Sequence, residues 1–448
     1  MENEPELEQR IVPKKQRGPW VFVPCLGFTD GIFNGFASQY VNLVFKTMGA
    51  SNTIVGLANL LQLPMGFKAL WAPAVERWGT ARSVLLTNML VIAFLIGCMA
   101  GIFMLPLNTT VAIAGMFFLT IVVISFFEIA SGAYRVSALT GGQLALFAGI
   151  SSAAFRLGAL FGNSFLIILV GKIHERMQSY HIAWAAVFGL VALIVVAVTF
   201  YLKTILPRPV CDFKNESKLT VKNYLMSFAG FFTQPGGIVI SVYLFLCRFG
   251  EGMLCVIKNP FFMDPADKGG MGMSLTDVGI MGPFVIIAMT LAGIAGGIIV
   301  KVVGLKKSFF ALGILMFVPH ACFSWLALYP KYGMIKLFGM NINPWVLGAT
   351  VIEVIGYAMA FAAIVTFSSL LSKNAGANKA TFGAVAGSFN LLGFMLGGAA
   401  SGIVQEQVGY FWTFNITILL AIPAWILILF LPLRQIIEKS AQLDAESK

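Results

Sequence analysis

The chain has 448 residues, of which 58% are hydrophobic and only 11% are charged, and its formal net charge is +11. A soluble globular protein carries about 25% charged residues, so the composition excludes that class and indicates an integral membrane protein. The basic residues lie mainly between apolar runs, as loop charges of membrane proteins do, so the positive charge does not indicate nucleic-acid binding.

The N-terminal part begins with a polar tail, residues 1–18, that carries no cleavage signature of a removable signal peptide. The apolar run at about 19–45 predicts the first transmembrane helix, because roughly 20 apolar residues span a bilayer. Within it Gly27, Gly31 and Gly35 recur at every fourth position. This spacing predicts close contact with another helix.

The stretch from Gly49 to Arg82 contains the clearest internal repeat. It opens with a polar turn in which Ser51 and Thr53 can cap a helix start. The pattern G-x-S-x-T-x-V-G begins at Gly49 and returns at Gly272, 223 residues later. A pattern repeated about half a chain length apart predicts a duplicated fold.

Apolar runs predict twelve spans, at about 19–45, 54–75, 83–105, 111–139, 143–171, 182–203, 237–258, 277–300, 307–329, 344–372, 380–404 and 410–433. A second repeat supports two halves, since Gly158 and Gly162 in span 5 resemble Gly393 and Gly397 in span 11. We therefore expect an all-α integral membrane protein with 12 transmembrane helices in two six-helix halves, which is the major facilitator fold. The expected domains are an N-terminal tail (1–18), a first half (19–203), a cytoplasmic linker (204–236), a second half (237–433) and a C-terminal tail (434–448).

The orientation follows from the Lys and Arg residues. Placing both termini in the cytoplasm puts most of the 30 Lys and Arg residues on that side, as the positive-inside rule requires. The linker contains a segment, 219–232, that could form an amphipathic helix at the membrane surface.

Acids within the predicted spans are the strongest mechanistic signal, because ionisable groups inside a membrane are costly and mark functional sites by default. They are Asp30, Glu128, Glu251 and Glu353, on spans 1, 4, 7 and 10. Corresponding spans of the two halves are expected to line a central cavity, so these acids are the proton-coupling candidates.

The basic residues within predicted spans are Lys68, Arg135, Arg156 and Arg248. They are the candidates for binding anionic groups of a substrate. Arg156 could instead pair with Glu128 across spans, and Lys68 could contact a gate.

Two interpretations of local pairing remain open. Arg248 and Glu251 are three residues apart and share a helix face, so they form either a structural ion pair or a site whose carboxylate is titrated as its partner moves. Glu353 has no basic partner nearby in the sequence, and an unpaired acid in a cavity holds its proton, which suits a coupling site.

A gate is expected at the inner end of span 2, where Glu76, Arg77 and Arg82 follow one another. The alternative is that these three residues are ordinary cytoplasmic loop charges and form no gate.

The six cysteines and three histidines have no metal-site spacing, and no nucleotide-binding loop is present, so we expect no metal and no cofactor. His320 has no acid nearby in the sequence, so an enzyme is not expected.

Several of these segments resemble a known family. Residues 63–77 (LPMGFKALWAPAVER) resemble the span-2 signature of AmpG-type muropeptide permeases, a group related to the acetyl-CoA transporters. Residues 128–135 resemble the acidic pattern of its span 4. Residues 248–264 and 353–357 are similar to an AmpG-like branch found in Bacteroidetes and relatives.

The resemblance implies a proton symporter for muropeptide-like solutes in a bacterial inner membrane. The expected partners are a small-molecule solute, protons and the lipid bilayer, and the protein is expected to work as a monomer. The sequence departs from the family pattern at Gly132, where a second acid belongs, and at Asp30, where the segment Thr29–Gly31 replaces Gly-Leu-Pro. Alternatives are therefore a siderophore or an acyl-CoA-type compound as the solute, or a transporter-like sensor without flux.

Overall fold

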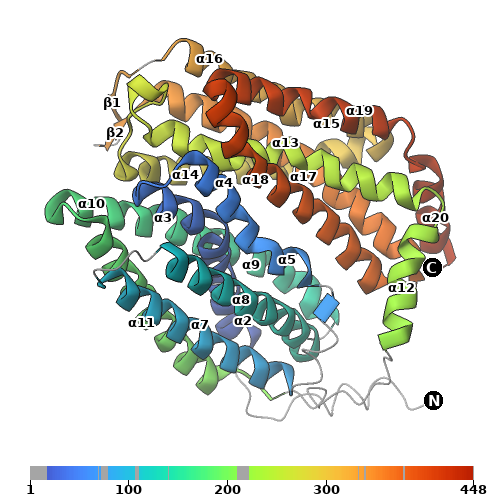
Figure 1. Cartoon of the computed structure of the whole chain (residues 1–448). Coiled ribbons are helices and arrows are strands. Elements are labelled where there is room, and N and C mark those ends of the chain that lie inside the picture. Colours follow the sequence, from blue (N-terminus) through green and yellow to red (C-terminus); the bar gives the residue numbers. More distant parts are fainter. Residues whose placement is uncertain are drawn as a thin grey trace. The chain divides into compact units, whose positions relative to one another are not determined.

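The computed structural model describes residues 18–68, 70–71, 79–105, 110–139, 141–208, 221–330, 332–337, 340–376 and 379–446 (Figure 1). By contacts the chain divides into two units. Unit 1 comprises residues 1–44 and 70–218, and unit 2 comprises residues 45–69 and 219–448.

Unit 1 is built from α-helices and two short π-helical segments: α2 (Pro19–Gly35), η1 (Phe36–Tyr40), α7 (Ala81–Phe103), α8 (Thr110–Ala138), α9 (Gly141–Leu160), η3 (Phe161–Leu166), α10 (Ile167–Met177) and α11 (Tyr180–Ile205). The helix α3 (Val41–Thr47) crosses from unit 1 into unit 2. The π segments η1 and η3 are joined by the Tyr40 hydroxyl, which donates to the Gly162 carbonyl at 2.7 Å. Such π turns widen a helix locally and occur often at functional sites.

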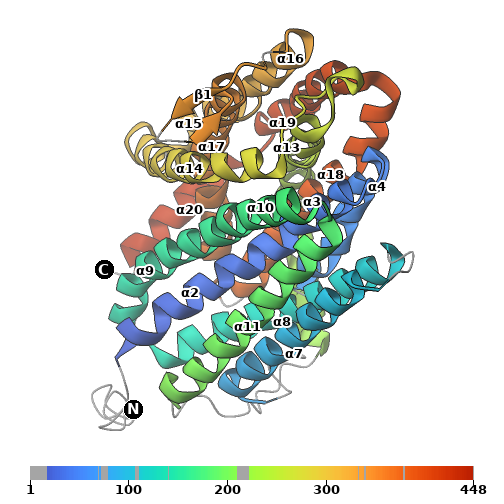
Figure 2. The same ribbon diagram turned by 90° about the vertical axis from the view of Figure 1, so that its left-hand side faces the viewer.

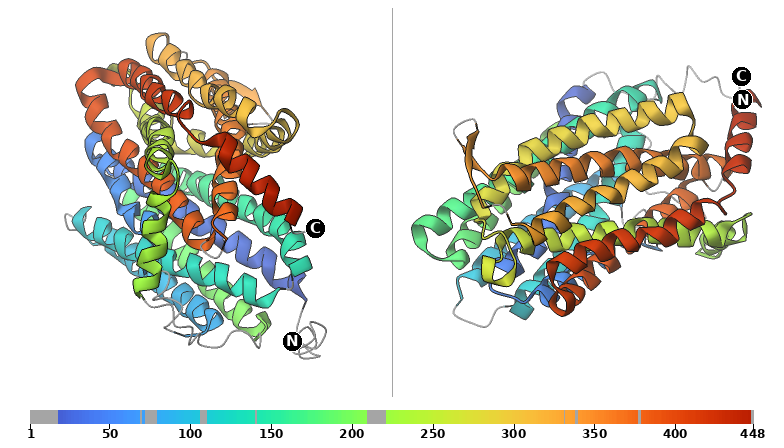
Figure 3. Two further views of the ribbon diagram at one scale, coloured as in Figure 1. Left: turned by 90° about the vertical axis from the view of Figure 1, so that its right-hand side faces the viewer. Right: turned by 90° about the horizontal axis from the view of Figure 1, so that it is seen from above.

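Unit 2 contains α4 (Asn52–Ala58), η2 (Asn59–Gln62), α5 (Leu63–Gly66), α12 (Val221–Thr233), α13 (Gly237–Met263), η4 (Ala266–Lys268), α14 (Leu275–Val303), α15 (Leu305–Phe317), η5 (Val318–His320), α16 (Ala321–Leu328), β1 (Ile335–Leu337), β2 (Met340–Ile342), α17 (Pro344–Asn374), α18 (Lys379–Leu419), α19 (Ala421–Ile428) and α20 (Leu433–Glu446). The helices α14 and α15 both pack along α17, seen as yellow and orange ribbons in Figure 3. The strands β1 and β2 form an antiparallel hairpin that the span pattern does not predict.

Helical segments occur at all twelve predicted spans. Among the described residues, nine segments are long and apolar enough to cross a membrane, and one of them, Thr381–Ile428, has 48 residues. This segment holds two predicted spans, which separate at Gly409, where the backbone leaves the helical region (φ 77°, ψ 171°). The first two predicted spans are interrupted by η1 and η2 and so fall outside those nine.

The predicted repeat has the same local structure at both places. Gly49 and Gly272 have positive φ angles of 81° and 61°, which glycine adopts without strain. Two residues later Ser51 and Ser274 each accept a hydrogen bond from the backbone N–H three residues on, and so cap α4 and α14. The prediction that Ser51 caps a helix is confirmed.

The helices α2 and α9 of unit 1 approach closely (Figure 2). A Cβ atom on Gly31 would collide with the carbonyl oxygen of Phe155, and one on Gly158 would collide with the backbone of Phe28. The expected close contact of the span-1 glycines is therefore confirmed at Gly31, because only a residue without a side chain fits there.

The helices α13 and α18 of unit 2 interlock in the same way. A Cβ atom on Gly252 would collide with the backbone of Phe394, and one on Gly397 would collide with the backbone of Phe249. As in unit 1, the glycine and the phenylalanine on each helix are three residues apart. The two units thus repeat one reciprocal contact.

This contact fixes how the two halves correspond. It matches Gly158 with Gly397, whereas Gly393, which the sequence comparison selected, makes the same kind of contact with the Phe245 backbone one helical turn earlier. It also matches Asp30, which precedes Gly31, with Glu251, which precedes Gly252. The two acids therefore occupy equivalent positions in their units.

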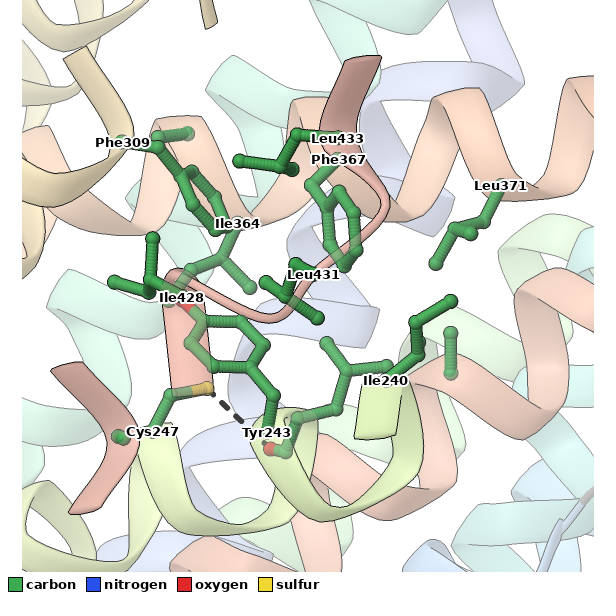
Figure 4. Packing of buried hydrophobic residues seen from close by; sticks show 14 of the residues in the cluster. Ile240, Tyr243, Cys247, Phe309, Ile364, Phe367, Leu371, Ile428, Leu431 and Leu433 are labelled. Atoms are coloured by element: carbon green, nitrogen blue, oxygen red, sulfur yellow. Dashed lines mark hydrogen bonds between the residues drawn. The ribbon is translucent and has the colours of Figure 1, made fainter. Parts of the chain in front are cut away.

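An apolar cluster holds the first part of α13 in unit 2 (Figure 4). The ring of Tyr243 lies 5.5 Å from that of Phe309 and 6.2 Å from that of Phe367, and Ile428 belongs to the same cluster. A second apolar cluster surrounds Leu254, Ile257, Phe261 and Phe262 near the other end of the helix. The middle of α13 lies between these two apolar regions.

The segment 45–69 is joined to the C-terminal part of the chain by buried polar contacts. Lys46 Nζ lies 2.5 Å from Asp264 Oδ1. The Asn52 side-chain amide donates to Asp264 at 3.1 Å and to Gln405 at 2.7 Å, and the Tyr410 hydroxyl donates to Asp264. Residues 45–69 therefore group with unit 2, although the sequence repeat assigns them to the first half. The five domains expected from the sequence, with the first half at 19–203 and the second at 237–433, therefore remain a prediction.

Candidate functional site

One face of α13 carries a row of polar residues. Arg248, Glu251, Cys255 and Lys258 are spaced by three or four residues, which puts them on one side of a helix. They lie in the middle and the second part of a 27-residue spanning helix. Arg248 is 8% exposed and Glu251 is 1% exposed, so these charges are buried.

Glu251 is paired with a histidine. Its Oε2 lies 3.3 Å from Nε2 of His320, which is completely buried in η5, and its Oε1 accepts a hydrogen bond from the Cys255 thiol at 3.1 Å. Within the described part of the chain its ion pair is with His320 and not with Arg248, so the interpretation as an Arg248–Glu251 pair is wrong. His320 has no acid nearby in the sequence, and the fold supplies one by bringing it beside Glu251, 69 residues away.

The hydrogen bonds around His320 define where its proton lies. The Thr417 hydroxyl donates to the Phe414 carbonyl at 2.7 Å, so toward His320 Nδ1, at 2.8 Å, it can only accept. A neutral His320 is therefore protonated on Nδ1, and its Nε2 presents a lone pair to the Glu251 carboxylate. Two acceptors at that distance repel unless a proton lies between them. A proton between Oε2 and Nε2 would satisfy both atoms.

Glu353 has a basic partner that the sequence did not predict. Lys258 Nζ lies 3.1 Å from Glu353 Oε2, and the two side chains are 14% and 1% exposed. Span 7 was predicted to end at about residue 258, but α13 continues to Met263, which puts Lys258 inside the helix. The one available signal was the spacing of Lys258, which follows Glu251 by seven residues and so shares its face.

Arg248 lies among three aromatic rings. Its guanidinium carbon is 5.0 Å from the ring centres of Tyr357 and Phe361 and 4.9 Å from that of Phe394, the geometry of cation–π contacts. Within the described structure its Nε and Nη1 atoms have no hydrogen-bond partner. Buried donors without partners are costly, so an anionic group that bonded them would gain stability there.

These residues form one electrostatic group. Glu353 interacts electrostatically with Glu251 and His320 as well as with Lys258. We define the α13 polar cluster as Arg248, Glu251, Cys255, Lys258, His320 and Glu353. It combines the Glu251–His320 pair, the Lys258–Glu353 ion pair and a buried guanidinium with two unsatisfied donors.

A different arrangement is found around Asp30 in unit 1. Arg135 Nη2 lies 3.0 Å from Asp30 Oδ2, Arg135 Nη1 donates to the Ser151 hydroxyl at 2.7 Å, and Nε donates to the Ser131 carbonyl at 3.3 Å. All three nitrogens of this guanidinium are engaged. The fold thus brings together one acid and one base from the two sets of sequence candidates.

The remaining span candidates lie on separate elements. Glu128 and Arg156 are half-buried on α8 and α9 of unit 1, and Lys68 is half-buried just beyond α5 in unit 2. Their roles remain predictions.

Of the gate candidates, Arg82 lies near the start of α7. Its guanidinium donates to the carbonyls of Lys203 at 2.8 Å and Leu206 at 3.3 Å, around the end of α11. Glu76 and Arg77 lie outside the described residues, and the gate remains a prediction.

Comparison with known proteins gives relatives over almost the whole chain. No protein-family model matches. The chain is 26% identical over 423 residues to an uncharacterised protein of Haemophilus influenzae, covering 91% of this chain and 93% of that one. It is 22% identical over 422 residues to a Rickettsia felis protein named "Putative transporter AmpG 4", covering 91% and 94% of the two chains.

Solved structures share the fold at low identity. A bacterial homologue of the lysosomal transporter Spinster has a TM-score of 0.67 at 14% identity, covering 96% of this chain and 99% of its own. The nucleoside transporter NupG has a TM-score of 0.63 at 17% identity (91% and 96%), and the E. coli xylose transporter XylE 0.62 at 14% (91% and 95%). These similarities confirm the predicted all-α membrane fold of the major facilitator type.

Proposed function

We propose that this chain, which has the major facilitator type of fold and relatives named as AmpG transporters, is a proton-coupled symporter of a medium-sized polar or amphiphilic organic solute. The observation that carries the proposal is the α13 polar cluster, which holds titratable groups and an unsatisfied cation in the middle of a spanning helix. By family resemblance the solute is muropeptide-like.

The proposed mechanism is alternating access, in which the two halves rock about a site near the middle of the membrane. Glu251 and Glu353 carry or relay the proton. Arg248, with Arg156, meets anionic groups of the solute, and Asp30 contributes to the cavity wall. A proton gradient can drive the cycle because burial makes the protonation of such carboxylates depend on what neutralises them.

The test is uptake into proteoliposomes under an imposed pH gradient. Wild-type protein should accumulate solute when the gradient is inward, and Glu251→Gln and Glu353→Gln should lose the dependence on it. The matched control is His181→Gln, since His181 is exposed at the start of α11 and outside the cluster. Uptake that ignores the gradient and both glutamine variants would refute proton coupling.

The solute is identified by a thermal-shift screen of the purified protein against muropeptides, siderophores, CoA esters and peptides, since a ligand of the folded state raises apparent stability. A siderophore or acyl-CoA compound remains the alternative solute. Binding without flux or counterflow would favour a sensor.

We place the protein in a bacterial inner membrane as a monomer with both termini in the cytoplasm, which protease accessibility in spheroplasts tests. We expect no enzymatic role, because relatives and structural neighbours over nearly the whole chain are named as transporters.

A further inference from the structure

The charges of the α13 polar cluster can be counted group by group. Lys258 and Glu353 neutralise each other at 3.1 Å. The pair of Glu251 and His320 is neutral as a whole when one proton lies between Oε2 and Nε2. Arg248 is then left without a counter-ion, consistent with its unsatisfied Nε and Nη1 atoms.

Loss of that proton changes the count. Glu251 becomes an anion with no proton between it and His320, and it lies three residues from Arg248 on the same helix face. It is then the counter-charge of that guanidinium. The cluster is therefore neutral in two conditions: with Glu251 ionised, or with the proton bound and one external anion at Arg248.

Any other combination leaves a net charge in a buried site. The penalty for an uncompensated buried charge is several kcal/mol, so the two neutral conditions are favoured. The other groups facing the pair do not alter this count, because Cys255 and Tyr357 are uncharged below about pH 8. Proton binding and anion binding are thus linked within one cluster.

We infer that the Glu251–His320 pair is the proton site and that one proton bound there accompanies one negative charge of the solute at Arg248. The solute class is then an organic monoanion, or a larger solute with a single carboxylate in this pocket, and the two charges move together without net charge transfer. Of the two carboxyl groups proposed above, Glu251 then accepts the proton directly, and Glu353 is limited to the relay, because it is ionised beside Lys258 in both neutral conditions. Thr417 acts as a positioning residue, because it keeps the His320 proton on Nδ1. The inference rests on the proposed function.

The test is the binding of N-acetylmuramic acid, a monoanionic amino sugar, to the purified full-length protein. Its uncharged counterpart, N-acetylglucosamine, is the comparison probe. Calorimetry in two buffers of different ionisation enthalpy should detect uptake of one proton for each N-acetylmuramic acid bound. At pH values above the titration of the Glu251–His320 pair, the Kd for N-acetylmuramic acid should rise about tenfold per pH unit.

Three variants separate a proton-site role from a structural one. Glu251→Gln mimics the protonated state, so it should still bind N-acetylmuramic acid, with a Kd that no longer changes with pH. His320→Gln should shift the pH profile, whereas the exposed control His181→Gln should leave it unchanged. Binding of N-acetylglucosamine, if any, should be independent of pH in every protein.

Proton uptake of zero in the wild type, a pH-dependent Kd retained in Glu251→Gln, or no binding of N-acetylmuramic acid at millimolar concentration would each overturn the inference. These results leave the proposed function intact if proteoliposomes still show gradient-driven uptake of another solute. Conversely, absence of gradient-driven flux with linked proton and anion binding would refute the transporter and keep the proton–anion site.

Discussion

The ion pair of Lys258 and Glu353 gives a quantitative test of how the polar cluster is buried. At 3.1 Å and an effective dielectric constant of about 20, the attraction between the two charges is about 5 kcal/mol. Glu353→Gln removes the anion and leaves Lys258 charged in a site where its side chain is only 14% exposed. Removing one partner of a buried pair costs about 3–5 kcal/mol, so this variant should be strongly destabilised.

The double variant Lys258→Met/Glu353→Gln should recover most of that loss, because neither charge remains to be buried. The measurement is the thermal unfolding midpoint of detergent-purified protein at one scan rate, evaluated as a double-mutant cycle. The control is Glu438→Gln, which breaks the exposed pair with Arg434 and should leave the midpoint unchanged. Single variants as stable as the wild type, or a double variant that loses the sum of both, would refute the buried ion pair.

Two further predictions concern unit 2. Gly397→Ala should lower the unfolding midpoint, because its Cβ would meet the Phe249 backbone and overpacking costs about 1–3 kcal/mol. The control Gly387→Ala, on the same helix, has open space around its Cβ and should be neutral or stabilising. Equal effects of the two variants would contradict the reciprocal contact. Burial raises the pKa of Asp264, but hydrogen bonds led by that from Lys46 outweigh it and lower the pKa below its ordinary value. A carboxyl group with a lowered pKa stabilises the folded state at pH values above its unfolded pKa of about 3.9, and this stabilisation is lost as the pH falls through the folded-state pKa. Asp264→Asn should therefore lower the unfolding midpoint at pH 7. The difference from wild type should disappear below about pH 4.

Much of the fold follows from the sequence because its signals are local. An apolar run of sufficient length predicts a spanning helix without knowledge of its neighbours. Gly49 and Gly272 both adopt a positive φ, which glycine tolerates, and each lies two residues before a serine that caps a helix. The glycine spacing of α2 predicted a close contact for the same reason. The interruption at Gly409 agrees with the gap between the last two predicted spans.

The site was predicted less well because its partners are distant in the chain. Glu251 and Glu353 were selected correctly as buried acids, with exposures of 1% each. Their partners, His320 and Lys258, come from other spans or from a helix end whose limit the hydropathy pattern placed too early. No local spacing in the sequence indicates that Glu251 pairs with His320, or that Arg248 contacts three aromatic rings instead of Glu251.

The equivalence of Asp30 and Glu251 gives the two units different electrostatic roles. Each acid precedes the glycine of the reciprocal helix contact, so the backbone holds both at the same depth of their helices. Asp30 is paired with Arg135, whose other guanidinium nitrogens donate to the Ser151 hydroxyl and the Ser131 carbonyl. Glu251 is paired instead with the imidazole of His320, and its other carboxylate oxygen accepts a hydrogen bond from the Cys255 thiol. The equivalent position thus carries an acid with a guanidinium partner in one unit and an acid with an imidazole partner in the other, so the two units share the acid but not its partner.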